Sequence, residues 1–332
     1  MTQFKVVITD FGSSDNDLEQ AVLSASGLDY NLVRLNYSTS DMLIPHINDA
    51  DALIVQWAKI DRHAIESLTR CKVISRYGVG VDMIDLKAAG EHAIPVANVP
   101  DFCVDEVSTH AIGFLLMLNR HMLLHHEHVK AGKWGGVAGG PPARLAGQTL
   151  GVVGLGNIGR AVVHKAKGFD LHILGYDPYL SPEKAAALGV EPVEWETLLA
   201  RSDYVTLHCP LTEETRHLVS KAQLAMMKPS AYLLNLSRGP VVDQSALYEA
   251  LVNHQIAGAA LDVLEQEPPL PDDPILGLDN VIFTPHTSSW SAASLEQLRR
   301  QTAQNVVDAL RGETPYSVVN RKELGWAIQT KN

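Results

Sequence analysis

Short apolar runs alternate with helical patterns along nearly the whole chain, and this rhythm constrains the fold more than any other feature. Each run has the length of a buried strand, and helical stretches separate most consecutive runs. A helical crossover is the usual connection between parallel strands, so the pattern predicts βαβ units and parallel sheets. The chain has 332 residues, which is enough for two such domains.

The apolar runs fall into two sets. The first set predicts strands at 5–10, 31–36, 51–57, 72–78 and 94–98, and the second predicts strands at 149–154, 171–177, 203–209, 231–237, 257–263 and 280–285. A helical pattern covers 105–130, a loop rich in glycine and proline follows, and a last helix is expected at 291–312.

These patterns predict an α/β protein with two Rossmann-like, doubly wound parallel-sheet domains. The second domain, residues 102–290, has the six strands of a full dinucleotide-binding sheet. The first, flavodoxin-like domain is predicted to comprise 1–101 and to be completed by 291–332, because the last helix leaves the second sheet and must pack elsewhere.

Composition argues against several classes of protein. The chain is 46% hydrophobic and 20% charged, as folded globular proteins are. Its net charge is −11 and it has no dense Lys/Arg run, which argues against nucleic acid as a partner. No apolar stretch approaches the length of a membrane span. Three separated cysteines form no disulfide or zinc pattern, so we expect a cytoplasmic protein.

The stretch GVVGLGNIGRAVVHKAKGFDLHILGYD predicts a dinucleotide site. Gly154, Gly156 and Gly159 follow an apolar strand and open a helix, and Asp177 ends the next strand. The glycines allow a tight turn, the approach of a pyrophosphate and close packing of helix on strand. Asp177 can accept hydrogen bonds from ribose hydroxyls and no arginine follows it, so the predicted cofactor is NAD and not NADP.

Three more strand ends carry polar residues that suit one reaction. Arg238 ends the strand at 231–237, the acids Asp262, Glu265 and Glu267 follow the next strand, and His286 follows the last. Ligands of such sheets bind beyond the carboxyl ends of the strands. A histidine can carry the hydroxyl proton of a 2-hydroxy acid, a carboxylate can orient the histidine, and an arginine can hold the substrate carboxylate. Each residue alone has an ordinary structural explanation, but together they favour a catalytic site.

These residues lie in motifs that resemble the D-isomer-specific 2-hydroxyacid dehydrogenases. The motifs occur in order as RYGVGVDMIDL, NVPDFCVDEVSTHAIGFLLML, GVVGLGNIGRAV, HCPLTEETRHLV, NLSRGPVVD, LDVLEQEPP and TPHTSSW. The subgroups most similar to this chain are phosphoglycerate-dehydrogenase-like and carboxyl-terminal-binding-protein-like. The resemblance implies an NAD-dependent oxidoreductase acting on a small 2-oxo or 2-hydroxy acid, and a homodimer built through residues 120–147.

The resemblance also implies residue roles. Arg238, Glu267 and His286 would be the catalytic set. Contacts with NAD are implied for Gly154, Gly156, Asn157, Ile158, Gly159, Asp177, His208, Cys209, Pro210, Thr215, Ser237 and Asp262, with Val104 and Ser108 from the linking helix. Contacts with the substrate are expected from Arg76, Tyr77, Gly78, Val79, Gly80 and Trp290.

Two positions depart from the family pattern near the expected pocket and leave the choice of 2-oxo acid open. Met83 stands where asparagine is common, and Thr-Ser-Ser-Trp follows His286 where glycine-rich sequence is frequent. Arg76 and Trp290 have structural alternatives, a surface arginine and a core tryptophan.

Other readings of the sequence stay open at this point. An NAD-sensing, corepressor-like interaction protein is one alternative function, and another enzyme of the same fold, such as a formate dehydrogenase, is a weaker one. The histidines from His121 to His128 lie on one helical stretch. They lack the spacing of common metal sites, so no metal is predicted and a polar face at a subunit contact is favoured.

Overall fold

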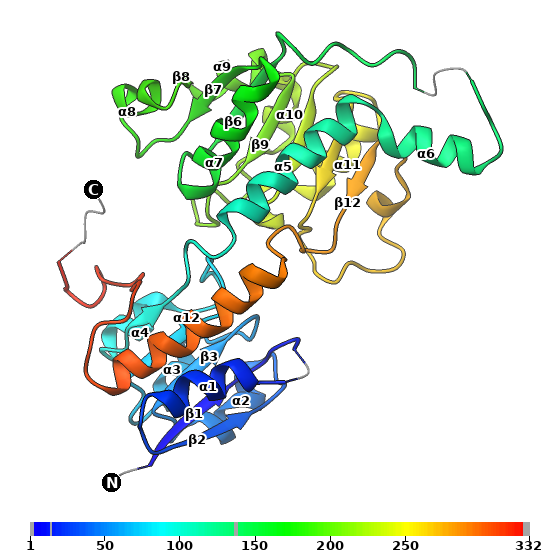
Figure 1. Ribbon diagram of the computed structural model, residues 1–332. Helices are drawn as coiled ribbons and strands as arrows, with labels where there is room; N and C mark the ends of the chain where they lie inside the picture. The colour runs from blue at the N-terminus through cyan, green and yellow to red at the C-terminus, as the bar shows by residue number, and fades with distance from the viewer. Residues whose placement is uncertain (1–2, 14, 136–138, 328–332) are drawn as a thin grey trace. The chain divides into compact units, whose positions relative to one another are not determined.

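The structure is a computed structural model that describes residues 3–13, 15–135 and 139–327. The chain divides into two compact units, Met1–Phe102 with Ser291–Asn332 and Cys103–Trp290. Figure 1 shows that each unit is built from helices and one sheet of strands. The two units are described in turn.

The first unit contains a five-stranded sheet in the order β2-β1-β3-β4-β5, and all of its pairings are parallel. Its strands are β1 (Phe4–Ile8), β2 (Tyr30–Arg34), β3 (Ala52–Val55), β4 (Val73–Arg76) and β5 (Val96–Ala97). Its helices are α1 (Asp17–Ala25), α2 (Ser40–Ile47), α3 (Arg62–Ser67), α4 (Leu86–Glu91) and α12 (Ala292–Leu310). This strand order is the flavodoxin-like order that the sequence predicted.

The C-terminal segment completes the first unit, which confirms the prediction. Helix α12 packs against β3, β4 and α1. In β4, the Ser75 hydroxyl donates to the carbonyl of Thr302 in α12 at 3.0 Å. Beyond the helix, Asn320 is fully buried and accepts from the Val96 N–H at 2.8 Å while donating to the Ile94 carbonyl at 2.9 Å. The segment thus satisfies backbone groups at the edge of β5 that would otherwise be buried without partners.

The second unit contains a seven-stranded parallel sheet in the order β12-β11-β10-β9-β6-β7-β8. Its strands are β6 (Thr149–Val153), β7 (His172–Tyr176), β8 (Glu191–Pro192), β9 (Tyr204–Leu207), β10 (Tyr232–Asn235), β11 (Gly258–Leu261) and β12 (Val281–Phe283). Its helices are α5 (Val104–Asn119), α6 (Met122–Lys130), α7 (Asn157–Ala166), α8 (Pro182–Ala187), α9 (Trp195–Arg201), α10 (Lys221–Met226) and α11 (Gln244–Val252), and short 3-10 turns are η1 (Lys167–Phe169), η2 (Gly239–Val241) and η3 (Pro274–Gly277).

The order of strands explains where a ligand of this sheet can bind. From β6 the chain adds β7 and β8 on one side and then β9 to β12 on the other, so the order reverses between β6 and β9. Ligands of doubly wound sheets bind at such a reversal, beyond the carboxyl ends of the strands. Every residue of β9 and β11 is buried, which is why these strands appear in the sequence as continuous apolar runs.

Two predicted elements differ from the structure. The prediction of six strands in the second sheet is wrong, because the two-residue strand β8 pairs with β7 without any apolar run. The single helix predicted over 105–130 is also wrong. It breaks at His121, which has a left-handed backbone (φ 51°) between α5 and α6. The buried Asn119 side chain ends α5 by donating to the Tyr204 hydroxyl (2.9 Å) and the Ala143 carbonyl (3.2 Å).

Candidate active site

The glycine-rich turn joins β6 to α7, and its three glycines have different reasons to be there. A Cβ on Gly154, where φ is +85°, would lie 2.9 Å from the backbone of His208 and Cys209. A Cβ on Gly159 would lie 2.0 Å from the carbonyl oxygen of Gly154. A Cβ on Gly156 would meet no described atom within 4 Å, and no side chain caps α7. The space beside Gly156 and the N–H groups of the first turn of α7 therefore fit the pyrophosphate of a dinucleotide.

Asp177 follows β7, the strand next to β6, and its carboxylate is held in a fixed orientation. One oxygen accepts from the Leu155 N–H at 2.8 Å and the other accepts from the Tyr179 N–H at 2.9 Å. Each oxygen has a second lone pair that a ribose hydroxyl can use. The neighbouring Pro178 and Tyr179 are exposed and bring no positive charge.

The end of β9 contributes an uncharged surface. The His208 Nε2 lies 2.9 Å from the Thr206 hydroxyl, and burial lowers the pKa of His208 to about 4. Burial raises the pKa of Cys209 to about 11, so its thiol keeps its proton at neutral pH. The Thr215 hydroxyl donates to the carbonyl of Pro210 at 2.6 Å, which closes the following turn.

The end of β10 presents Arg238 on a turn that the buried Asn235 builds. The Asn235 amide donates to the carbonyl of Arg238 at 2.9 Å, and its oxygen accepts from the N–H (3.1 Å) and hydroxyl (2.9 Å) of Ser237. The Arg238 guanidinium donates to the Ser237 carbonyl at 2.9 Å. An asparagine that closes on its own backbone is a common way to turn a chain at the end of a strand.

A histidine and a glutamate meet beyond β11 and β12. The His286 Nδ1 donates to Oε2 of Glu267 at 2.6 Å, and the other oxygen of Glu267 accepts from the Leu264 N–H at 2.9 Å. The backbone of His286 is left-handed (φ 54°), and its N–H donates to the carbonyls of Asp262 (2.8 Å) and Thr284 (3.0 Å). Because a carboxylate can only accept, the bond fixes the Nδ1 proton and makes Nε2 the nitrogen that exchanges a proton with a substrate.

Asp262 anchors the loop that carries His286. It is 2% exposed, and its carboxylate accepts from the Thr284 hydroxyl at 2.5 Å and from the N–H groups of Thr287 (2.9 Å) and Ser288 (3.1 Å). His110 of α5 reaches the same Thr284 hydroxyl at 3.1 Å, and burial lowers the pKa of this histidine. Sequence analysis missed His110 and Thr284, because the bond between them spans 174 positions.

In the first unit, the loop after β4 is shaped by Arg76. This arginine is 4% exposed, and its guanidinium lies over the Trp57 ring, 5.1 Å from the centroid. A Cβ on Gly78, where φ is +141°, would lie 1.4 Å from Nη1 of Arg76. The Asn98 amide holds the Val79 carbonyl at 2.6 Å. The alternative of a surface arginine is therefore wrong.

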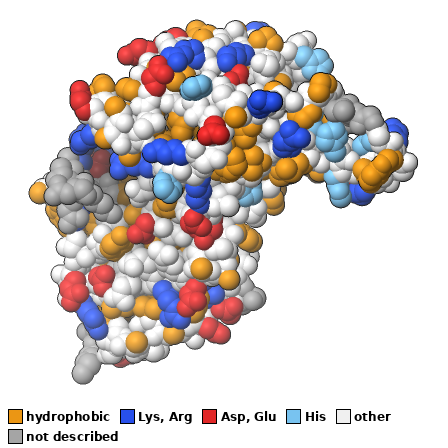
Figure 2. Space-filling view, turned by 45° about the horizontal axis from the view of Figure 1, so that its top comes forward, with side chains coloured by type: hydrophobic (Ala, Val, Ile, Leu, Met, Phe, Trp, Pro, Cys, Tyr) orange, Lys and Arg blue, Asp and Glu red, His pale blue; other side chains and the backbone are white. Residues whose placement is uncertain are grey.

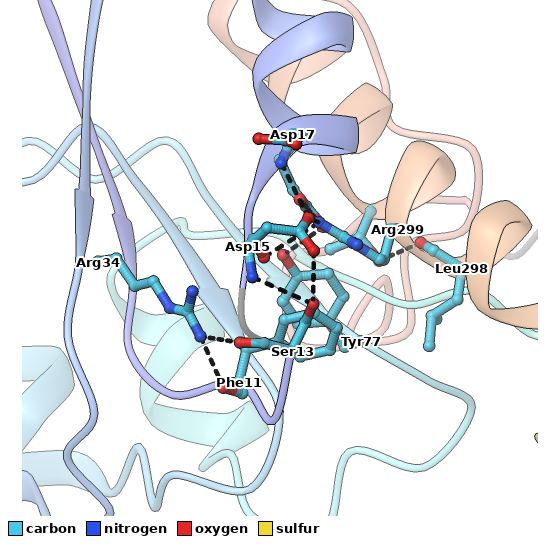
Figure 3. Close-up of polar contacts among 10 residues, drawn as sticks. Phe11, Ser13, Asp15, Asp17, Arg34, Tyr77, Leu298 and Arg299 are labelled. Carbon is cyan, nitrogen blue, oxygen red and sulfur yellow. Dashed lines mark hydrogen bonds and ion pairs between the residues drawn. The ribbon is translucent and has the colours of Figure 1, made fainter.

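Tyr77, beside Arg76, is anchored by a buried ion pair; Figure 3 shows Tyr77 with Arg299 and Asp15. Its hydroxyl donates to Glu19 at 3.0 Å, and Glu19 is fully buried against Arg299 of α12, with N–O distances of 2.8 and 2.7 Å. The same guanidinium reaches Asp15 at 2.8 Å, and the Tyr77 ring stacks on Phe11 with 4.3 Å between centroids. Burial, and then the charge of Glu19, raise the pKa of Tyr77 well above its usual value.

The remaining predicted residues lie as follows. Trp290 is 59% exposed, so the alternative of a core tryptophan is wrong. Val104 and the buried Ser108 lie in the first turns of α5, where the Ser108 hydroxyl donates to the Val104 carbonyl at 2.6 Å.

Among the described residues, no group of three or more His, Cys, Asp or Glu side chains is arranged to hold a metal. No described helix is long and apolar enough to span a membrane.

Comparison with known proteins shows the family of the chain. The family model described as D-isomer specific 2-hydroxyacid dehydrogenase, NAD binding domain, matches residues 112–288. A glyoxylate reductase of Korarchaeum cryptofilum is 42% identical over 286 residues, which are 85% of this chain and 86% of that enzyme. A D-3-phosphoglycerate dehydrogenase of Methanocaldococcus jannaschii is 43% identical over 293 residues, and the match spans 55% of that longer enzyme.

A solved structure resembles the chain over nearly its full length. The D-lactate dehydrogenase of Aquifex aeolicus, complexed with NAD and lactic acid, has a TM-score of 0.85 at 28% identity, covering 93% of this chain and 96% of that one. The doubly wound sheet and its glycine-rich turn fit a dinucleotide, and the family model and the relatives identify an NAD-binding oxidoreductase. The chain belongs to the D-isomer-specific 2-hydroxyacid dehydrogenases.

Proposed function

We propose that this protein is an NAD-dependent D-2-hydroxyacid dehydrogenase that also works as a 2-oxoacid reductase. The observation that carries the proposal is the 2.6 Å bond between His286 and Glu267, which lies on the same edge of the sheet as Arg238. NAD, when bound, supplies the hydride chemistry, and this edge supplies a proton carrier and a cation for the substrate.

His286 acts as the acid and base of the reaction. In oxidation, its Nε2 takes the proton of the C2 hydroxyl as the hydride leaves C2. In reduction, the protonated imidazole returns that proton to the 2-oxo oxygen. Glu267 holds the ring through Nδ1 and stabilises its positive form. Arg238 binds the carboxylate of the substrate and polarises the 2-oxo group.

Cofactor binding is assigned to the unit Cys103–Trp290. The glycine-rich turn receives the pyrophosphate, and Asp177 receives the ribose hydroxyls. A 2′-phosphate would meet the negative charge of Asp177, and Pro178 and Tyr179 after it bring no positive charge, which supports NAD over NADP. Further contacts are assigned to Asn157, Ile158, His208, Cys209, Pro210, Thr215, Ser237, Asp262, Val104 and Ser108.

Substrate binding is assigned to the unit formed by Met1–Phe102 and Ser291–Asn332. The backbone of Tyr77–Gly80 would receive the substrate carboxylate, and the buried cation of Arg76 adds positive charge beside it. Trp290 is assigned to the far end of the substrate. The named activities of the relatives support a small 2-oxo acid, since they include glyoxylate reductase and D-lactate dehydrogenase.

A homodimer and a cytoplasmic location complete the proposal. Helix α6 buries none of its residues and exposes Met122, Leu123, Leu124 and Val129. In Figure 2, apolar side chains (orange) and histidine side chains (pale blue) lie together at the right of the view. Such an apolar helix face favours a subunit contact. Residues 136–138, within the predicted contact region 120–147, lie outside the described residues.

The cysteines support the cytoplasmic location. All three are free thiols, as is usual in a reducing compartment.

A substrate screen tests the activity. NADH oxidation is measured with glyoxylate, pyruvate, hydroxypyruvate, phenylpyruvate and 3-phosphohydroxypyruvate, and the product is assayed for its D configuration. We expect turnover of at least one acid and a D product wherever C2 is chiral. Absence of turnover with every acid, or an L product, would contradict the proposal. The corepressor-like alternative stays a prediction, to be tested by NADH-dependent capture of a peptide partner.

A further inference from the structure

His217 contacts both of the loops that carry the proposed catalytic residues, although nothing in the proposed reaction uses it. It lies between β9 and α10. Its backbone N–H donates at 2.8 Å to the carbonyl of Pro240, which lies two positions after Arg238. Its Nε2 lies 2.5 Å from Oε1 of Glu265, two positions before Glu267. One residue thus connects the turn after β10 with the loop after β11.

The two loops also touch each other directly. A Cβ on Gly239 would lie 1.9 Å from the Leu264 carbonyl oxygen and 2.5 Å from the Glu265 nitrogen, so only glycine permits this contact. The Glu265 N–H donates to the Gln244 side chain at 3.0 Å. The backbone of the Glu267 loop is therefore packed and hydrogen bonded, and His217 supplies a side-chain contact to it from outside.

The contact between His217 and Glu265 adds little to the stability of the fold. His217 has a left-handed backbone (φ 52°), which is unfavourable for a residue other than glycine. Its side chain is 44% exposed and that of Glu265 is 31% exposed. Exposed pairs of this kind add little to stability because water screens them. A strained residue that makes a weakly stabilising contact beside a reactive site is a candidate for a functional role.

We propose that His217 and Glu265 form a positioning pair that sets the distance between Arg238 and Glu267. The inference rests on the proposed function. When the pair is intact, Glu267, which orients His286, stays at a fixed distance from Arg238, which holds the substrate. Small displacements of such groups lower turnover strongly because the reacting atoms lose their alignment.

Three variants and one control separate this role from general stability. His217→Asn tolerates a left-handed backbone but is too short to reach Glu265, whereas His217→Gln keeps an N–H within reach. Glu265→Ala removes the other partner. The control, Arg201→Ala, removes an exposed ion pair with Glu191, 2.6 Å long, that touches neither loop.

For the purified protein, kcat and KM are measured with NADH and the best 2-oxo acid of the screen. We expect kcat to fall on the order of tenfold in His217→Asn and in Glu265→Ala, with no further fall in the double variant. We expect His217→Gln to recover most of the loss, the NADH Kd to stay within about twofold, and Arg201→Ala to match the wild type. An unchanged kcat in His217→Asn, or equal losses of kcat and NADH affinity, would overturn the proposal.

Hydrogen exchange separates a failure of this inference from a failure of the proposed function. If the wild type reduces none of the acids, the proposed function fails, and the amides of 236–241 and 262–267 then decide the structural claim. Faster exchange in both loops of His217→Asn, with the rest of the unit unchanged, supports the positioning pair. Wild-type exchange rates in both loops would overturn it.

Discussion

The partly buried His208 makes a sharp prediction about acid stability. Burial holds its pKa at about 4, against an ordinary value of 6.5. Between these values the unfolded chain binds a proton that the folded chain does not, so stability must fall as the pH drops from 6.5 to 4. A difference of about 2.5 pH units corresponds to a loss of about 3 kcal/mol.

The variant His208→Gln isolates this contribution, because its amide does not titrate and still reaches the Thr206 hydroxyl. Opening free energies of β9 amides, from hydrogen exchange at pH 6.5 and pH 4, are compared in both proteins. Other titrating groups cancel in the comparison. We expect the wild type to lose about 3 kcal/mol more than the variant. A difference below about 0.5 kcal/mol, the size of an ordinary surface effect, would refute the reasoning.

Three further predictions follow from packing. Gly159→Ala should unfold or strongly destabilise the second unit, because its Cβ would lie 2.0 Å from a carbonyl oxygen. Gly156→Ala should keep the melting temperature of the wild type and lose NADH affinity. Equal melting temperatures of the two variants would contradict this difference. Glu19→Gln should lower the unfolding free energy by about 3 kcal/mol, because Arg299 loses its buried carboxylate partner and keeps only the exposed Asp15. A loss below about 1 kcal/mol in urea titration would count against this prediction. Leu123→Asp should shift the protein from dimer to monomer in analytical ultracentrifugation, and an unchanged dimer would exclude α6 as the contact.

The sequence predicted strands well where burial on both faces produces continuous apolar runs, as in β9 and β11. It failed where tertiary contacts decide local structure. Strand β8 has two exposed residues and exists because β7 offers a free edge. The break between α5 and α6 has no glycine or proline. It depends on Asn119 and on a tyrosine 85 positions away, which no local pattern contains.

The polar residues at strand ends were predictable because a doubly wound sheet brings the carboxyl ends of its strands to one edge. The residues that hold these side chains and their loops in place could not be predicted from the sequence. The bond from His110 to Thr284 and the pair of Glu19 with Arg299 join positions far apart in the chain. Local signals existed for Asn235, a turn-forming residue at a strand end, and for Gly239, which precedes a proline.

The bond between His286 and Glu267 carries the central claim, and single-turnover NADH oxidation tests it most directly. The wild type and His286→Ala are saturated with NADH and mixed with the best 2-oxo acid, and the Kd for NADH is measured for both. We predict that the variant oxidises NADH about 10³-fold more slowly, as expected for a lost general acid, while its NADH Kd stays within about twofold. A rate within tenfold of the wild type would contradict the assignment of His286 as the proton carrier.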